Sequence, residues 1–317
     1  MPDPGWTRRV KLQQLRVILA VADSASLVKA SERVGLSQPA ISKIINEVEA
    51  DLGVALFVRN SRGTHVTDFG RMLAGHAKRV FSQLEQVEQE IHDAREGLSG
   101  HVVAGALLAG SAQLLPRAIA RLHRRLPGIR TTVVEGTYEH LVPALHQGRL
   151  DFIVGRLPAY RYREGLAVEA FYQEEIHFVV RPSHDALALA APGLAQLVGW
   201  PWILPLPDTT LRQMLEAAFL DLNLDLPAAP CESLSVAGNR TLILETDCIG
   251  AFPARVVAPD LRAGLLARLP VTPPLYFGPV GISHLKGAPF SKAAEALLGE
   301  MRRVGEEAIT GMHSGKQ

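Results

Sequence analysis

The segment 26–67 constrains the fold more than any other part of this chain, because two short helical patterns meet there at a sharp turn. The first pattern has apolar residues at helical spacing: Leu27, Ala30 and Val34. Ser26 stands where a side chain can cap the first turn, and Gly35 stands where a left-handed residue would end the helix. The spacing therefore predicts a short helix that stops at this glycine.

A second helix is predicted directly after the turn. Ser37 can cap it, and Pro39 falls in its first turn, where the missing N–H of proline costs no hydrogen bond. Its apolar stripe consists of Ile41, Ile45, Val48 and Leu52, and Gly53 follows the stripe. The opposite face carries four polar side chains: Gln38, Ser42, Lys43 and Asn46. Amide, hydroxyl and ammonium groups of this kind bind base edges and phosphates.

The residues after this helix predict a basic β-hairpin. From Leu52 through Thr67 the chain has no acidic residue, and Arg59 and Arg62 flank a turn sequence between two β-favouring runs. Such a hairpin is typical of a wing that contacts DNA backbone or minor groove. Polar-faced helix pairs also occur in enzymes, so the helix pair by itself leaves both interpretations open.

Composition limits the classes of function. The chain has 317 residues, 47% of them hydrophobic, which is enough for two or three compact units. It carries 33 basic and 32 acidic side chains, so we do not expect it to coat nucleic acid nonspecifically. No stretch approaches the roughly 20 apolar residues of a membrane helix, and no secretory signal is evident, so we expect a cytoplasmic protein. Cys231 and Cys248 favour two small buried thiols over a redox pair.

Residues 68–97 predict one long helix with a regular apolar seam. The seam residues alternate steps of four and three: Leu73, Ala77, Val80, Leu84, Val87, Ile91 and Ala94. This a/d pattern, held over about three heptads, predicts pairing with another helix. The alternative is that the stripe packs on the chain's own domain. Because the helix leaves the predicted DNA-binding unit and ends in a glycine-rich break, we favour self-pairing, which would space two units over two half-sites.

From residue 101 onward, strands alternate with helices. Strands are expected at 101–108, 129–136 and 150–157, with helices at 113–125 and 138–147. A strand pair is expected at 168–172 and 176–180, and a second set follows with strands at 201–206, 232–236, 248–252 and 265–271 and helices at 211–220 and 237–245. A returning strand at 275–285 and a terminal helix at 291–308 complete the chain. This order predicts two doubly wound α/β lobes that form a cleft.

Ligands of such sheets bind beyond the carboxyl ends of the strands, near the free N–H groups of helix N-termini. The residues expected at these ends are Ser111, Ala112, Thr137, Arg156, Thr209 and Phe252. A single Ser or Thr there more often only caps a helix, so it is the convergence of these residues on one cleft that favours a ligand site. Arg156 has two interpretations, a charge for an anionic ligand or a surface residue.

Motifs for catalysis and metal binding do not occur in the sequence. It contains no GxxxxGK[ST], HExxH, CxxC or GxSxG pattern, so we expect no cofactor and no enzyme activity. Two alternatives stay open beside a DNA-binding regulator. One is a small-molecule-binding α/β protein or enzyme with an N-terminal helical adapter. The other, a nonspecific chromatin-like protein, fits poorly with the neutral charge.

The segment from Leu15 to Thr67, above all GLSQPAISKIINEVEADLGVALFVR, resembles the winged helix-turn-helix of LysR-type transcriptional regulators. The run ALLAGSAQLLPRAIARLHRRLPGIRTTVVEGTYEHLVPALHQGRLDFIVGRL resembles the first lobe of their effector domain, which is like that of periplasmic binding proteins. The resemblance implies that residues 38–43 begin the recognition helix, that the long helix dimerises, and that Ser111 and Thr137 hold the acid group of an effector.

The fold class that follows is α/β: an N-terminal all-α winged helix-turn-helix (10–67), a long linker helix (68–97), and two doubly wound lobes (101–163 with 271–310, and 164–270). The implied function is sequence-specific regulation modulated by a small anionic or aromatic metabolite. The expected partners are double-stranded operator DNA, this effector and further copies of the chain in a homodimer or homotetramer, with RNA polymerase left open. The expected DNA contacts are Ser26, Ser37, Gln38, Pro39, Ser42, Lys43, Asn46, Arg59 and Arg62.

Overall fold

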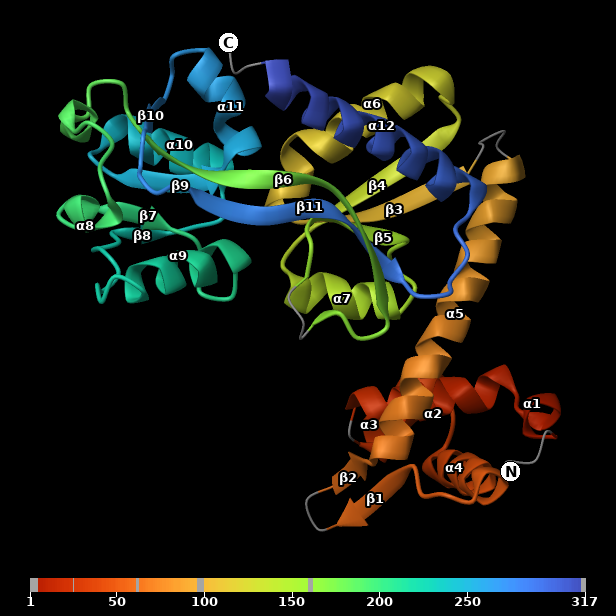
Figure 1. Cartoon of the computed structure of the whole chain (residues 1–317). Helices are drawn as coiled ribbons and strands as arrows, with labels where there is room; N and C mark the ends of the chain where they lie inside the picture. Colours follow the sequence, from red (N-terminus) through yellow and green to blue (C-terminus); the bar gives the residue numbers. More distant parts are fainter. Residues whose placement is uncertain (1–4, 25, 61–62, 96–99, 159–161, 315–317) are drawn as a thin grey trace. The chain divides into compact units, whose positions relative to one another are not determined.

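The computed structural model of the chain (Figure 1) describes residues 5–24, 26–60, 63–95, 100–158 and 162–314. These residues divide into two compact units. Unit 1 consists of Met1–His92 with His146–Arg149, and unit 2 of Asp93–Leu145 with Leu150–Gln317. Within the described residues, no helix is both long enough and apolar enough to cross a membrane.

Unit 1 is a small helical domain with one hairpin. Its elements are α1 (Trp6–Arg9), α2 (Leu12–Ser24), α3 (Leu27–Val34), α4 (Gln38–Leu52), β1 (Phe57–Asn60), β2 (Gly63–Val66) and α5 (Asp68–Arg95). The strands pair antiparallel, from Phe57 opposite Val66 to Asn60 opposite Gly63. The core contains the buried face of α2 together with the predicted stripe of α4, of which Ile41, Ile45 and Val48 are at most 3% exposed. Burial of each such side chain contributes about 1.5–3 kcal/mol.

The predicted ends of the helix pair are confirmed. Ser26 accepts a hydrogen bond from the Lys29 N–H at 3.4 Å, and Ser37 accepts one from the Ala40 N–H at 3.4 Å. Gly35 and Gly53 end the two helices with φ of 67° and 69°, a conformation that glycine adopts without the steric cost of a Cβ. Gly35 and Ser37 therefore set the sharp turn between α3 and α4 from local sequence, while Ser26 and Gly53 fix the outer ends of the pair.

The apolar seam of α5 divides into two parts. Leu73 packs against the core of unit 1 and Ala77 is buried, so the alternative of packing on the chain's own domain holds for these two residues. The next four seam residues are exposed, at 40–58%: Val80, Leu84, Val87 and Ile91. The side chain of Ala94 lies outside the described residues. An exposed apolar row of this length on one helix is unusual for a surface that stays in water.

Unit 2 is built on one sheet, whose described strands run in the order β4-β3-β5-β11-β6-β9-β7-β8, with β10 paired to β6. The strands are β3 (Gly100–Ala106), β4 (Ile129–Glu135), β5 (Phe152–Arg156), β6 (Leu166–Val180), β7 (Trp202–Leu204), β8 (Cys231–Glu232), β9 (Ile249–Pro253), β10 (Ala267–Leu269) and β11 (Leu275–Leu285). Strands β3, β4 and β5 are parallel, as are β7, β8 and β9, and the long antiparallel pair β6 and β11 joins the two sets. The predicted two-lobed α/β fold is confirmed.

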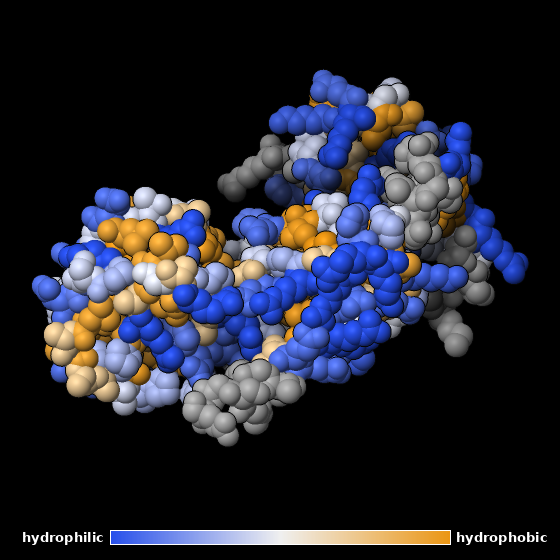
Figure 2. All heavy atoms as spheres, turned by 90° about the horizontal axis from the view of Figure 1, so that it is seen from above, coloured by the Kyte–Doolittle hydropathy of each residue, from blue (hydrophilic) through white to orange (hydrophobic). Residues whose placement is uncertain are grey.

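Helices cover both faces of this sheet. They are η1 (Gly110–Leu114), α6 (Leu115–Arg125), α7 (Tyr138–His146), η3 (Asp185–Ala188), α8 (Leu194–Leu197), α9 (Thr210–Leu220), α10 (Val236–Glu245), α11 (Ala254–Arg262) and α12 (Lys292–Ser314). Figure 1 shows α6, α11 and α12 on one side of β6 and β11, and α7 and α9 on the other. Figure 2 views the molecule from above and shows hydrophilic side chains over the middle of the face that carries α6, α11 and α12.

Three predictions for unit 2 need correction. The strand pair expected at 168–172 and 176–180 is the single strand β6, because the charged Glu174 between the two apolar runs is buried and ion-paired rather than placed in a turn. The strand expected at 232–236 is confined to Cys231–Glu232, because Ser235 caps α10 by accepting a hydrogen bond from the Gly238 N–H at 3.1 Å. Cys248 is buried as expected, whereas Cys231 is only half-buried.

Helix α11 was not predicted, since Pro259 lies inside it. Proline has no N–H, so the carbonyl of Arg255, four residues earlier, lacks its helical hydrogen bond. Gln113 of η1 supplies the missing donor: its Nε2 lies 2.8 Å from the Arg255 carbonyl oxygen. A side chain distant in sequence therefore compensates for the proline and connects α11 to η1.

Candidate functional site

The polar face of α4 lies open on unit 1. Gln38, Lys43 and Asn46 are exposed and Ser42 is half-buried, on the side of the helix opposite its buried stripe. The Lys43 side chain is 79% exposed, and its Nζ lies 4.0 Å from the Glu47 carboxylate, one helical turn away. An exposed pair of this kind contributes only about 0.3–0.5 kcal/mol, so a phosphate can displace it at little cost.

Ser37 and Pro39 stand at the N-terminal end of this face. Pro39 occupies the first turn of α4, and both residues are exposed. The start of a helix offers unpaired N–H groups and a positive dipole end, which together favour a phosphate. Ser26 is half-buried and caps α3, so its hydroxyl is already used by a backbone N–H.

A carboxylate of α4 holds the hairpin in place. Glu49 Oε1 accepts hydrogen bonds from the N–H groups of Leu56 and Phe57, at 2.7 and 3.1 Å. The hairpin also packs on the start of α5, because a Cβ on Gly70 would lie 2.2 Å from the Leu56 carbonyl oxygen. Glu49 was not identified from the sequence, because its helical spacing gives no sign that it binds the backbone of the wing.

The predicted wing arginines are described only in part. Arg59 lies in β1 opposite Thr64, and the structure describes its backbone. Arg62 lies outside the described residues. The confirmed part of the prediction is therefore the hairpin itself, which follows α4 in sequence and whose first strand is bonded to Glu49 through the Phe57 N–H.

The hydroxyls expected to bind an effector in unit 2 make local hydrogen bonds. Ser111 Oγ, in η1, donates to the Leu108 carbonyl at 3.3 Å. Thr137 Oγ1 lies 3.1 Å from His140 Nδ1, after the end of β4. Thr209 caps α9, where it accepts from the Arg212 N–H at 3.3 Å and donates to a backbone carbonyl. The simpler interpretation, a helix cap, thus describes Thr209.

Arg156 lies at the end of β5 and is held against β11. Its Nε donates to the Phe277 carbonyl, and its guanidinium carbon lies 5.4 Å from the centre of the Phe277 ring. Burial lowers the pKa of this guanidinium, because desolvation disfavours the charged form. The hydroxyl of Tyr138 donates to the Arg156 carbonyl, so the structure connects Arg156 to the residue next to Thr137.

The remaining two predicted effector residues meet in a second apolar cluster. Phe252, in β9, is 4% exposed and packs with Val179 and Ile243, and Ala112 of η1 lies against the same cluster. Tyr138 therefore connects Arg156 to the segment of Thr137, whereas Ala112 and Phe252 belong to a separate apolar cluster. Within the described residues, no group of three or more His, Cys, Asp or Glu side chains could hold a metal ion.

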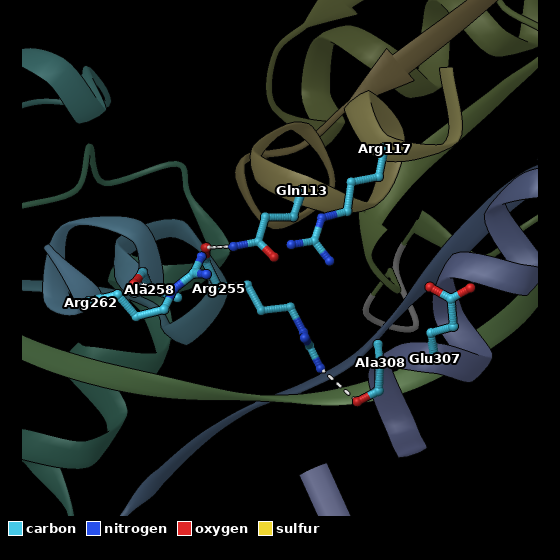
Figure 3. A pocket seen from close by; sticks show the side chains of 7 residues that line it. All are labelled: Gln113, Arg117, Arg255, Ala258, Arg262, Glu307 and Ala308. Carbon is cyan, nitrogen blue, oxygen red and sulfur yellow. Dashed lines mark hydrogen bonds between the residues drawn. The ribbon is translucent and has the colours of Figure 1, made fainter. Parts of the chain in front are cut away.

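A cavity of about 420 Å³ lies elsewhere in unit 2 (Figure 3). Its lining residues are Gln113, Arg117, Arg255, Ala258, Arg262, Glu307 and Ala308. None of the predicted effector residues is among them. The arginines of α11 were not identified from the sequence because that helix was not predicted. The sequence shows only two arginines, seven positions apart, in a segment that contains a proline.

Comparison with known proteins identifies both units. Residues 12–71 match the family model described as a bacterial regulatory helix-turn-helix protein of the lysR family, and residues 95–306 match the LysR substrate binding domain. GbpR, a transcriptional regulator of Azospirillum brasilense, is 30% identical over 299 residues, which cover 94% of this chain and 87% of GbpR. PcaQ, a transcriptional regulator of Agrobacterium fabrum, is 31% identical over 313 residues, or 97% of this chain and 99% of PcaQ.

Solved structures share the fold. Full-length OxyR from Pseudomonas aeruginosa superposes with a TM-score of 0.63 at 23% identity, over 92% of this chain and 95% of that one. CbnR in complex with its target DNA gives a TM-score of 0.61 at 20% identity, over 93% and 99%. Together with the two family models, the curated relatives identify a regulator rather than an enzyme. The chain belongs to the LysR family of transcriptional regulators, with an N-terminal helix-turn-helix and a C-terminal effector-binding domain.

Proposed function

We propose that α4 is the recognition helix and that it reads operator DNA with the side chains of Gln38, Ser42, Lys43 and Asn46. The observation that carries this proposal is the exposure of polar side chains on one face, beside a hairpin that Glu49 holds in place. Amide groups discriminate bases, whereas an ammonium group mainly binds phosphate. The helix therefore carries both functions within its first turns.

The flanking residues complete the proposed contact with the DNA backbone. Ser37 and Pro39 stand at the N-terminus of α4, where free N–H groups favour a phosphate. Ser26 is placed at the start of α3, and Arg59 and Arg62 belong to the hairpin proposed as the wing. Guanidinium groups of a wing bind phosphates or enter the minor groove.

The exposed half of the α5 seam supports self-association into a homodimer or homotetramer. Val80, Leu84, Val87 and Ile91 follow one another at steps of four, three and four, the spacing by which two helices interlock. A pair of such helices places two helix-turn-helix units a set distance apart, as two half-sites of an operator require. Residues 10–67 and 68–97 are then the DNA-binding and dimerising parts of a cytoplasmic protein.

The effector is proposed to be a small anionic or aromatic metabolite bound between lobe I (101–163 with 271–310) and lobe II (164–270). The proposed contacts are Ser111, Ala112, Thr137, Arg156, Thr209 and Phe252, which all lie near the carboxyl ends of strands. Because β6 and β11 join the two lobes, a ligand that binds one arrangement of the lobes better than another shifts the population toward it.

A mobility-shift titration with the protein's own upstream DNA tests the proposal. We expect binding that is stronger than to random DNA of equal length and that weakens steeply with salt, because each neutralised phosphate releases counterions. Addition of the effector should change the affinity of the protein for the DNA or the bend of the bound DNA. Equal affinity for upstream and random DNA at every salt concentration would contradict the proposal.

A further inference from the structure

The cavity of unit 2 lies where three segments distant in sequence meet (Figure 3). Gln113 and Arg117 come from η1 and α6, Arg255 and Arg262 from α11, and Glu307 from α12. Its volume of about 420 Å³ falls within the usual range of small-molecule pockets. Two alanines complete the lining, and the arginine side chains contribute apolar methylene surface as well as charge.

The single carboxylate in the wall pairs mainly with an arginine outside the wall and interacts more weakly with Arg117. Glu307 is bound by Arg121, which does not line the cavity, through two hydrogen bonds of 2.8 and 2.6 Å. This pairing lowers the pKa of Glu307 below its ordinary value and keeps it charged. Arg117 and Arg262 are exposed, and neither forms an ion pair with any residue in the described ranges. The wall therefore carries an excess of positive charge, three arginines against one carboxylate.

Arg255, a third arginine of the lining, is held by contacts of both its side chain and its backbone. Its guanidinium lies 4.3 Å from the centre of the Tyr172 ring, 3.4 Å from the Glu174 carboxylate and 3.3 Å from the Ala308 carbonyl oxygen. Its backbone carbonyl is held by Gln113 at 2.8 Å. A donor held on all sides loses little freedom when it binds a ligand.

Two polar groups packed against Arg255 are buried: the Tyr172 hydroxyl, and the Glu174 carboxylate, whose Oε2 lies 3.4 Å from Arg255 Nε. Tyr172 is 6% exposed and Glu174 is 3% exposed. Burial also raises the pKa of Glu174 to about 7, so near neutral pH its charge compensates Arg255 only in part.

We propose that this cavity binds a small organic dianion, a dicarboxylate or a phosphate ester, through Arg117 and Arg262, with Arg255 as a third, preformed donor. Planar guanidinium groups match the oxygens of carboxylates and phosphates, and an excess of two guanidinium groups over carboxylates in the wall selects a ligand with two negative charges. A neutral ligand would leave this excess uncompensated, and a cation would be repelled.

The cavity joins elements assigned above to different lobes, since α6 and α12 belong to lobe I and α11 to lobe II. A bound dianion thus favours the arrangement in which α11 lies beside α6 and α12, and gives the regulator a second input. This regulatory consequence rests on the proposed function, whereas the binding itself does not.

Calorimetric titration of the full chain at constant ionic strength tests the binding. Succinate and inorganic phosphate are the probes, acetate is the singly charged control, and the stronger of the two dianions identifies the class of ligand. We expect saturable binding of at least one dianion, weakened about tenfold or more by Arg117→Gln and by Arg262→Gln, since each removes a charge-assisted contact. Arg117→Lys should restore part of the affinity.

Two matched controls distinguish this cavity from the rest of the surface and from the site proposed at the strand ends. Arg124→Gln removes an exposed arginine of α6 that does not line the cavity, and it should leave the affinity unchanged. Ser111→Val with Thr137→Val should also leave it unchanged, because these residues belong to the strand ends. The cavity is not a dianion site if neither dianion binds saturably, if both glutamine variants bind like the native chain, or if the Ser111 and Thr137 pair abolishes binding.

Discussion

The buried charges of β6 predict a distinctive dependence of stability on pH. Burial raises the pKa of Glu174 from 4.5 to about 7 and lowers the pKa of His177 from 6.5 to about 4. Arg255 lies beside the first of these groups, and Glu175 and Arg268 influence the second. The Glu174 and His177 side chains are only 3% and 15% exposed, so solvent screens these effects little.

The two shifts act in opposite directions. Between pH 4.5 and 7, folded Glu174 holds a proton that the unfolded chain has released, so the free energy of unfolding falls as the pH rises. Between pH 4 and 6.5, the unfolded chain holds a proton on His177 that the folded state lacks, so the free energy of unfolding rises with pH. Each difference of about 2.5 in pKa corresponds to about 3 kcal/mol. In the native chain the two effects largely cancel where the windows overlap.

Single substitutions should separate the two effects. The assay is urea unfolding between pH 4 and 7.5, followed by fluorescence in a Trp6→Phe background so that only Trp200 and Trp202 of unit 2 emit. Relative to this background, Glu174→Gln should gain about 3 kcal/mol in unfolding free energy between pH 4.5 and 7, and His177→Gln should lose about 3 kcal/mol between pH 4 and 6.5. If the two differences are independent of pH, or change in the same direction, these side chains do not control the pH dependence.

Three further perturbations address α5, the hairpin and the effector site. Leu84→Glu should weaken self-association roughly tenfold or more in sedimentation equilibrium, since it places a charge in the exposed seam, whereas Gln83→Glu off the seam should not. Glu49→Ala should lower the free energy of local opening at the hairpin by about 1–3 kcal/mol and speed amide exchange of the two N–H groups that Glu49 binds. Unchanged exchange would exclude a role of Glu49 in holding the hairpin. Ser111→Val with Thr137→Val should abolish the effector response with DNA affinity nearly intact, and a surviving response would place the effector elsewhere.

Local signals explain what the sequence predicts well. The helix pair of unit 1 is specified by side chains within a few positions of one another, such as the cap at Ser37 and the terminating Gly53. The strands and helices of unit 2 follow from apolar runs and periodicity for the same reason. Solvent exposure of the polar face of α4 could likewise be predicted, because an apolar stripe on one side of a helix leaves the other side to water.

The parts that were not predicted depend on long-range contacts. Pro259 argues against α11 until Gln113 is known to satisfy the carbonyl that the proline leaves without a donor. Glu174 argues against one continuous β6 until Arg255, in another element, is known to pair with it. The cavity lined by η1 with α6, α11 and α12 has no sequence signature, since its residues come from three segments that only the fold brings together.

DNA reading by α4 is tested most directly by comparing Gln38→Ala with Lys43→Ala on upstream and random DNA over a range of salt concentrations. If α4 reads DNA as proposed, Gln38→Ala loses about 1–3 kcal/mol on the upstream site and little on random DNA. Lys43→Ala instead weakens both and lowers the slope of log affinity against log salt by about 1. Equal loss on both DNAs for Gln38→Ala, with an unchanged salt slope for Lys43→Ala, would show that α4 is not the recognition helix.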